Sequence, residues 1–445
     1  MTEAPPESPR LRSFLRRLTP PEGTNIDRAW ARLVESGTPL VEAIRGDRRR
    51  LLVTFVWRPG GRPRECSVYS TVSTADPSGD WREGTRLRPL DRLGVWYRSF
   101  RLDRGTRLSY GFAAQAFPDA PTPTSWLRYQ RRIRTDPGNP RRLEFPRDPD
   151  IPHDAPVSLS VLELPGASIA KWAASRGPSS WKEDVHRFRS RLLRNERTIW
   201  VSSPTTFTPR SAECNVLLVF DGFTYRTTVP GPRIVENLVA AGRLGPTVAV
   251  FVGTGPAGRE RELACQPAFA DFLALELMPW LRRTYHIRTH PSRTVVAGSS
   301  LGGVMAAYAG LRYPREFGRV LVQSGAFLGK VPGHEREAEW LTRQYALAPR
   351  QPVEFYLDAG TLERAIPPGG GVSILTSVRH FRDVLEARDY RVNYFEFEGG
   401  HDYVCWTETL SRGILTLLSH RSATRRQPAH RYRRREFPKG RADLA

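Results

Sequence analysis

The sequence predicts an α/β protein: a doubly wound, mainly parallel sheet with an all-β sandwich domain before it. From Val157 onward, short apolar runs of strand length alternate with longer stretches of helical periodicity. This alternation is typical of a parallel sheet with helices on both faces. Between residues 48 and 115, short strand-like segments follow one another with turn residues between them, as in a β-sandwich. A chain of 445 residues is long enough for roughly two or three domains.

The first third of the chain predicts an arm, a helix and the sandwich. Residues 1–45 form a polar arm followed by the helical segment IDRAWARLVESG, with Asn25 or Asp27 as its cap. Residues 46–142 predict a sandwich of immunoglobulin-like type, with strands in RRLLVTFVWR, ECSVYSTVS, GVWYRSFRLD and RLSYGFAAQ. Residues 143–156 are rich in proline and predict a linker.

Residues 157–420 predict the α/β domain. Its expected strands are VSLSVLEL, RTIWVSSP, CNVLLVFDG, TVAVFVGTG, RTVVAG, RVLVQSG, VEFYLDAG and YRVNYFEF. Its expected helices span 232–241, 268–285, 303–313, 338–345 and 373–388. Residues 421–445 carry nine basic side chains against two acidic ones, and we expect a disordered basic tail there.

The charge of the chain bears on its partners. A formal net charge of +22 favours an anionic substrate, a nucleic acid or an acidic partner. The common nucleic-acid recognition motifs do not occur and the arginines are spread along the chain, which argues against a nucleic acid. No apolar run approaches the roughly 18 residues of a membrane-spanning helix, so we expect no membrane partner.

The N-terminus and the cysteines bear on the compartment. The first twenty residues lack the apolar core of a secretory signal peptide. Cys66, Cys214, Cys265 and Cys405 lie far apart without a CxxC pair. We therefore expect reduced thiols in the cytoplasm, and neither a zinc site nor a disulfide framework.

The segment Gly298-Ser299-Ser300-Leu301-Gly302 is the strongest local signal for chemistry. It matches G-x-S-x-G, the sharp turn that lifts a nucleophilic serine off the end of a strand at the start of a helix. The bare pattern is weak, but a β-branched strand precedes it and an alanine-rich helix follows it. In this context the motif predicts Ser300 as the nucleophile of an α/β-hydrolase.

A nucleophilic serine needs a base and an orienting carboxylate, which follow it in the order acid, then histidine. His401 lies on a loop directly after the last strand, where it is able to reach the serine. Two carboxylates follow the preceding strand. Asp358 lies within that strand, whereas Glu363 lies on the loop beyond it; we favour Glu363 and leave Asp358 open.

The oxyanion of an acyl-transfer intermediate needs two backbone N–H donors. The first is expected from Leu301, the residue after the nucleophile. The second is expected from Phe223, because Gly222 after the strand VLLVF allows the chain to turn that N–H inward.

Together these segments resemble the enterochelin esterase family. The matching pieces include the R-x-x-E-L segment from Arg259, RTVVAGSSLGG, DAGTLE, the G-G-H-D-x-x-x-W segment from Gly399 and, in the sandwich region, the D-P-x-N-P stretch from Asp136. The resemblance implies Ser300 as nucleophile, His401 as base and a carboxylate at the Glu363 position. It further implies hydrolysis of the ester bonds of a cyclic tri-serine lactone bearing catecholates. It implies no cofactor, since iron arrives as part of the ferric siderophore substrate.

Two further residues are candidates for substrate binding. A ferric tris-catecholate is a compact trianion, which suits an arginine-lined site. Arg259 either faces the pocket or pairs with Glu262 one helical turn on, and Trp406 either walls the pocket or belongs to the core. The run after the strand RVLVQSG holds one aromatic, Phe327, where family members often carry several.

Two alternatives to the siderophore esterase remain open. One is an esterase or acyltransferase on another ester, such as a feruloyl ester or a peptide-synthesis product, which would use the same triad. The other is a non-catalytic protein that uses its positive field to hold an anion. A missing nucleophile, base or acid would favour the second alternative, but a candidate for each is present.

Overall fold

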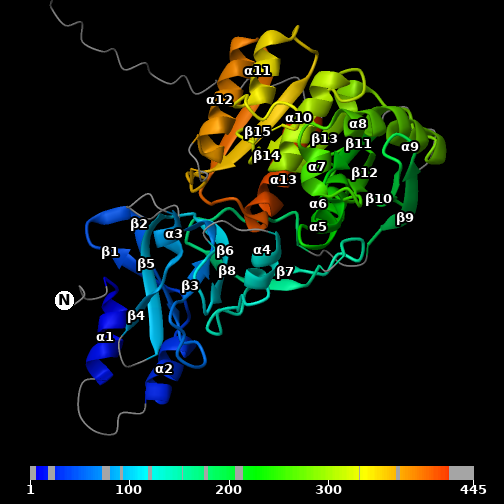
Figure 1. The fold of residues 1–445 in the computed structure, drawn as a ribbon. Helices are drawn as coiled ribbons and strands as arrows, with labels where there is room; N and C mark the ends of the chain where they lie inside the picture. The colour runs from blue at the N-terminus through cyan, green and yellow to red at the C-terminus, as the bar shows by residue number, and fades with distance from the viewer. Residues whose placement is uncertain are drawn as a thin grey trace, which may run out of the picture.

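The computed structural model describes residues 7–18, 26–72, 81–90, 94–118, 123–152, 154–174, 179–205, 214–329, 331–366 and 371–419. Two domains lie side by side, a blue-to-cyan β-rich domain and a green-to-orange α/β domain (Figure 1). The basic tail predicted at 421–445 lies outside the described residues.

The N-terminal domain is a sandwich of two four-stranded sheets, ordered β1-β2-β5-β4 and β3-β6-β8-β7. Its strands pair antiparallel, and their inward side chains form one core that includes Phe55, Phe100, Tyr110 and Phe112. The strands are β1 (Leu40–Ile44), β2 (Asp47–Trp57), β3 (Ser67–Tyr69), β4 (Arg88–Leu90), β5 (Val95–Asp103), β6 (Arg107–Ala113), β7 (Arg142–Phe145) and β8 (Val157–Glu163).

Four helices accompany the sandwich: α1 (Pro9–Leu18), α2 (Ile26–Glu35), α3 (Trp81–Thr85) and α4 (Pro123–Gln130). The predicted short helix is present as α2. The predicted polar arm also contains a helix, α1, because Leu11 and Phe14 are buried with Leu33 against the sandwich.

The predicted boundary at residue 157 is wrong. β7 lies partly within the predicted linker at 143–156, and β8 was assigned to the α/β domain, yet both pair with each other and β8 pairs with β6. The proline-rich sequence between β7 and β8 suggested a linker, but it connects two neighbouring strands of one sheet. The sandwich therefore extends to Glu163, and the chain passes to the second domain after it.

The second domain contains an eight-stranded sheet in the order β16-β15-β14-β13-β11-β12-β10-β9. The six strands from β16 to β12 are parallel, and β10 and β9 are antiparallel additions at one edge. The strands are β9 (Trp181–Ser190), β10 (Asn195–Pro204), β11 (Asn215–Val219), β12 (Thr247–Val252), β13 (Thr294–Ser299), β14 (Arg319–Gln323), β15 (Glu354–Gly360) and β16 (Arg391–Phe397). This sheet confirms the predicted α/β-hydrolase class.

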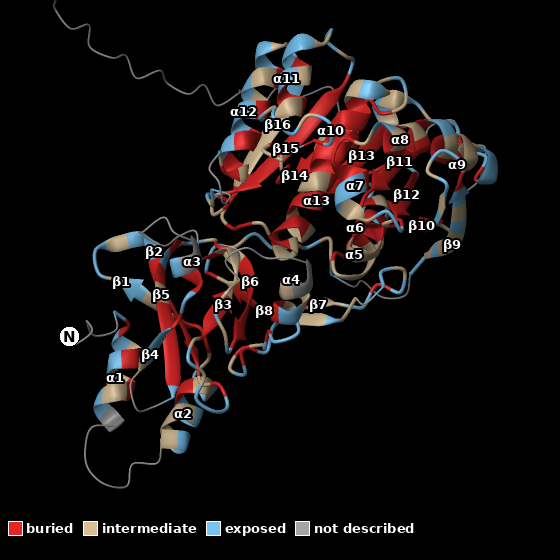
Figure 2. Ribbon diagram, viewed as in Figure 1, coloured by how far each residue is buried: buried red, intermediate tan, exposed pale blue. Residues whose placement is uncertain are grey.

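Helices cover both faces of this sheet. Alternate residues of β11 point to opposite sides: Leu218 joins the core beneath α8–α12, and Leu217 joins the core beneath α5, α6 and α13. The helices are α5 (Gly222–Thr227), α6 (Gly231–Ala240), α7 (Arg259–Leu263), α8 (Pro267–Asp271), the π-helix η2 (Phe272–Leu277), α9 (Met278–Thr284), the 3₁₀ turn η3 (Pro291–Arg293), α10 (Leu301–Arg312), α11 (Trp340–Leu347), α12 (Ile374–Ala387) and α13 (Tyr403–Leu418). Burial is concentrated in the parallel strands (Figure 2).

The edge strand β9 was missed because its sequence, WKEDVHRFRS, is rich in charge. It pairs with β10 along its whole length. Lys182, Arg187 and Arg189 are exposed along it. Its free edge is therefore lined by charged side chains.

The Asp136–Pro140 stretch anchors the sandwich. The buried Asp136 carboxylate accepts hydrogen bonds from Thr38 Oγ1 (2.6 Å), Tyr110 OH (2.7 Å) and Gly138 N (2.9 Å). It joins the segment before β1, strand β6 and its own turn. Its role in the described structure is therefore packing of the N-terminal domain.

We expect Asp136→Ala to destabilise the sandwich by about 2–4 kcal/mol, because the substitution leaves several buried donors without an acceptor. Denaturant unfolding followed by tryptophan fluorescence measures this effect in the first transition. Asp383→Ala serves as the control, since Asp383 is 59% exposed and pairs only with the adjacent Arg382. A loss for Asp136→Ala no larger than for the control would contradict the anchoring role.

Candidate active site

The candidate site lies where the parallel strands end. Ser299, Gln323, Asp358 and Phe395 stand opposite one another across β13, β14, β15 and β16. The loops that leave these strands therefore emerge at one edge of the sheet. Glu363 and His401 lie on two of these loops, and Ser300 directly follows β13.

Ser300 occupies a sharp turn between β13 and α10. Its φ of 56° and ψ of −122° lie in a region that residues other than glycine rarely adopt. The turn holds because Ser300 N donates to Gln323 O at 2.9 Å, while Ser300 O accepts from Ala326 N. A Cβ on Gly298 would lie 2.5 Å from the Gly302 carbonyl carbon, so only glycine fits there. The strain and the close approach are those of a nucleophile turn.

Glu363 and His401 are hydrogen bonded. Glu363 Oε1 lies 2.8 Å from His401 Nδ1, and Glu363 Oε2 accepts from Gly360 N at 3.0 Å. The carboxylate is almost fully buried, with 1% of its side chain exposed, whereas the imidazole is 28% exposed. The arrangement assigns the proton to Nδ1 and leaves Nε2 free to act as an acceptor.

Asp358, the alternative acid, is buried within β15 and faces a different partner. Its Oδ1 accepts from Ser324 N at 3.1 Å. Burial raises the pKa of the Asp358 carboxyl well above its usual range. Of the two carboxylates, Glu363 is the one brought to the imidazole.

Ser300 and His401 are linked through intermediates. Trp406 packs against the imidazole with ring centroids 4.8 Å apart, and its Nε1 donates to Ser324 Oγ at 3.0 Å. Ser324 follows Gln323, the residue that anchors Ser300 N. Within the described ranges no hydrogen bond joins Ser300 Oγ to His401. Such bonds commonly tighten only when substrate binds.

The two predicted oxyanion donors begin helices at this edge. Leu301 is the first residue of α10 and Phe223 the second of α5, positions whose N–H groups precede the first intrahelical hydrogen bond. The reason given for Gly222 needs correction. Asp221, with φ of 52°, makes the left-handed turn, and Gly222 is required because a Cβ would lie 2.6 Å from the Phe251 carbonyl carbon.

Arg259 is held beside the nucleophile turn by Asp221. Its Nε and Nη2 form a bidentate pair with the Asp221 carboxylate at 2.6 and 2.8 Å, and Nη2 also reaches Ser299 O at 3.3 Å. The alternative pairing with Glu262 is wrong, because Glu262 is buried against Arg197. The Arg259 side chain keeps 29% of its surface exposed. A positive charge therefore stands at the same edge as Ser300.

Trp406 was predicted to wall the pocket, and this prediction is wrong. The residue is 2% exposed and belongs to the core beneath His401. It packs edge-on against both His401 and Tyr403. Its geometry supports the imidazole and offers almost no surface to a ligand.

Sequence reasoning missed several residues at this edge. Tyr403 packs against Tyr225 and against Phe145 of the sandwich, and burial raises its pKa. Tyr225 OH donates to Gln323 Oε1 at 2.7 Å. Only the position of Tyr403 directly after the G-G-H-D segment could have pointed to it; Tyr225 carried no signal.

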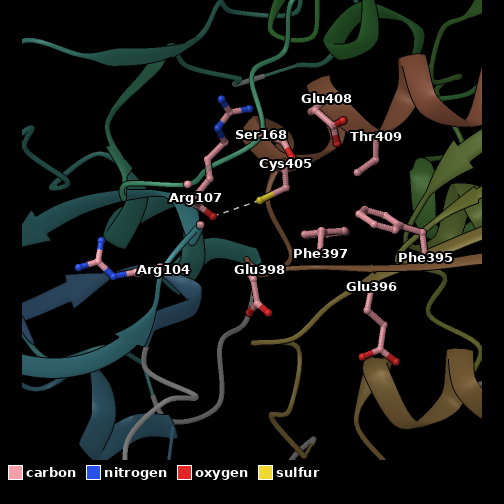
Figure 3. Close-up of a pocket in the computed structure, with 12 residues that line it drawn as sticks. Arg104, Arg107, Ser168, Phe395, Glu396, Phe397, Glu398, Cys405, Glu408 and Thr409 are labelled. Atoms are coloured by element: carbon pink, nitrogen blue, oxygen red, sulfur yellow. Dashed lines mark hydrogen bonds between the residues drawn. The ribbon is translucent and has the colours of Figure 1, made fainter. Parts of the chain in front are cut away.

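A cavity of about 190 Å³ lies between the two domains, away from Ser300 (Figure 3). Arg104 and Arg107 line it from the sandwich, and Phe395, Glu398 and Cys405 line it from the α/β domain. None of the predicted catalytic or substrate-binding residues lines it. Among the described residues, no three or more His, Cys, Asp or Glu side chains gather as metal ligands. Nor does any helix in these ranges have the length and apolar character to cross a bilayer.

The sheet order, the strained serine turn and the carboxylate–histidine pair define an esterase of the α/β-hydrolase class. The family model described as "Putative esterase" matches residues 190–417, more than half of the chain, and the model for the N-terminal domain of enterochelin esterases matches residues 52–173. The chain belongs to the enterochelin esterase family.

Individual relatives agree with this assignment. Iron(III) enterobactin esterase from Dickeya dadantii (strain 3937) is 29% identical over 415 residues, covering 88% of this chain and 92% of its own. The Escherichia coli (strain K12) enzyme of the same name is 26% identical and covers 82% and 90%. The crystal structure of ferric enterobactin esterase from Salmonella typhimurium superposes with a TM-score of 0.68 at 24% identity, covering 88% and 98%, and supports the fold.

We expect Glu363→Gln to lower kcat by roughly 10³–10⁴-fold, because the amide no longer stabilises the protonated imidazole or enforces its tautomer. Asp358→Asn is the matched control, and we expect less than about a tenfold loss, since this carboxyl bonds only to groups behind the imidazole. Steady-state hydrolysis of a p-nitrophenyl ester measures both. A larger loss at Asp358 would assign the acid to that residue instead.

Proposed function

We propose that this protein is a serine esterase that hydrolyses the ester bonds of a catecholate siderophore trilactone of the enterobactin type. The observation that carries the proposal is the Glu363–His401 hydrogen bond at the sheet edge where Ser300 occupies its strained turn. The relatives that match along most of both chains are named for iron(III) enterobactin, which supports this substrate class.

The proposed reaction proceeds through an acyl-enzyme. His401 Nε2 takes the Ser300 proton as Oγ attacks the ester carbonyl, and Glu363 stabilises the resulting imidazolium. The Phe223 and Leu301 N–H groups hold the oxyanion of the tetrahedral intermediate. His401 then gives its proton to the departing alkoxide, and a water molecule repeats the sequence on the acyl-Ser300 ester.

Arg259 is the proposed contact for the anionic part of the substrate. Its partner Asp221 fixes the guanidinium beside Ser299 O, so that little side-chain freedom is lost when an anion binds. A ferric tris-catecholate carries three negative charges on a compact surface, and we propose the ferric form as the preferred substrate. Iron in this scheme belongs to the substrate, and the reaction uses no cofactor.

We further propose that the enzyme works in the cytoplasm. All four cysteines are free thiols and all are buried. Burial raises the pKa of the Cys66 and Cys214 thiols to about 12, so both stay protonated and unreactive at neutral pH. Thiols of this kind suit a reducing compartment.

We expect Ser300→Ala to abolish hydrolysis of both the trilactone and p-nitrophenyl esters, because no other group supplies the nucleophile. Mass spectrometry of products from ferric and iron-free catecholate trilactones, with feruloyl esters beside them, measures turnover and substrate class together. The control is the unchanged melting temperature of Ser300→Ala. Wild-type turnover by this variant would remove Ser300 from the mechanism, and cleavage of feruloyl esters alone would reject the siderophore substrate.

We expect Arg259→Met to raise KM for the ferric trilactone by about 10–100-fold, the equivalent of losing one charge-assisted contact. KM for the neutral p-nitrophenyl acetate should change by less than about threefold, because no anion is bound there. Since Asp221 loses its partner in this variant, the double variant Arg259→Met/Asp221→Asn is measured beside it. Equal changes in KM for both substrates would argue against an anion contact.

A further inference from the structure

The loop that carries His401 is held from outside its own domain. Strand β6 of the sandwich pairs with β8 on one side, from Arg107 to Tyr110. On its other side β3 covers only Gly111–Ala113. The first half of β6 therefore presents an uncovered edge, and its backbone donors there need partners.

Residues on both sides of His401 take up these donors. Arg107 N donates to Glu398 O at 3.1 Å, and Arg107 forms a parallel bridge with Gly399. Two residues further along β6, Ser109 donates to Asp402 Oδ2 twice, from N at 2.5 Å and from Oγ at 2.7 Å. The alternation by two residues is that of a strand edge, so the histidine loop completes the sheet of the other domain.

A third contact closes the loop at its C-terminal end. Cys405 Sγ donates to Arg107 O at 3.2 Å, the bond that crosses between the domains in Figure 3. On the inner side, Leu362 N donates to Gly399 O at 2.8 Å, which ties the same loop to the segment carrying Glu363. The loop thus lies between the acid loop and β6.

Asp402 joins the two domains and also begins α13. Its Oδ1 accepts from Val404 N at 3.0 Å as the helix cap, while Oδ2 faces Ser109. The side chain is 6% exposed, so its charge is satisfied by these donors and not by bulk water. A buried carboxylate with four donors on both sides fixes the residue next to His401.

We propose that strand β6 of the sandwich domain positions the general base, with Ser109 acting through Asp402 to hold His401 against Glu363. The inference rests on the proposed function, since it requires His401 to be that base. It makes Ser109 and Asp402 positioning residues: neither contacts the reacting atoms. The catalytic histidine is then fixed only when the two domains are docked.

Asp402→Ser tests the proposal while keeping the helix cap, because serine caps helices well but is too short to reach β6. We expect kcat for p-nitrophenyl acetate to fall by about 10–100-fold with KM within about twofold, since a base displaced by a fraction of an ångström slows chemistry but not binding. Ser109→Ala, which keeps the backbone donor, should lose about 3–10-fold. Ser109→Thr retains the hydroxyl and should restore kcat to within about twofold of wild type.

Thr228→Val is the matched control. Thr228 Oγ1 donates to Glu144 O at 2.9 Å, so this variant also removes one hydrogen bond between the domains, but it leaves the histidine loop untouched. We expect its kcat to stay within about twofold of wild type. An equal loss in Thr228→Val would mean that any weakening of the domain contact slows the enzyme, and the specific role of Ser109 would be rejected.

His401→Ala separates the two levels of inference. Retained turnover in His401→Ala overturns the proposed function itself. An inactive His401→Ala beside a wild-type kcat in both Asp402→Ser and Ser109→Ala, each with an unchanged melting temperature, overturns only the positioning role. Should Asp402→Ser fail to fold, the Ser109→Ala and Ser109→Thr pair decides the question alone.

Discussion

The common register of the parallel strands is the constraint on which the site depends. Because β13, β14, β15 and β16 end level with one another, groups far apart along the chain leave the sheet at one edge. Hydrogen bonds between strands fix this register, and a one-residue slip would turn every side chain to the opposite face. The Glu363–His401 bond is formed between the loops after two adjacent strands, β15 and β16, and inherits its geometry from them.

The site is built in layers behind the reacting groups. Glu363 is buried and bonded to Gly360 N, so the imidazole meets a fixed acceptor. Trp406 supports the other side of His401, and its Nε1 is bonded to Ser324. Asp358, which faces Ser324 N, therefore belongs to the support of the imidazole and not to its proton transfer. Groups held in this way need little reorganisation during the reaction.

The sequence allowed the nucleophile turn, the base and the acid to be named because each has a local signature. Ser300 lies in a glycine-defined turn, and Glu363 and His401 each directly follow a recognisable buried strand. Strands β10 to β16 were equally recognisable from their apolar runs. Each of these features depends on residues within one short segment.

The remaining features depend on tertiary contacts that no local pattern reveals. The partner of Arg259 is Asp221 and not the nearby Glu262, because the buried Arg197 already occupies Glu262. Strand β8 has the composition of a core strand but joins the other domain, and only its pairing shows this. The contact of Ser109 with Asp402 spans most of the chain and carries no signal in either segment.

The charged edge strand β9 bears on how the molecule behaves at high concentration. An open β edge with unpaired amides and carbonyls is a template on which a second molecule is able to add a strand, and growth of this kind leads to fibres. Lys182, Arg187 and Arg189 project from β9 at intervals that would bring like charges together in such an assembly. The edge of the sheet thereby guards the protein against polymerisation without occupying any part of the catalytic machinery.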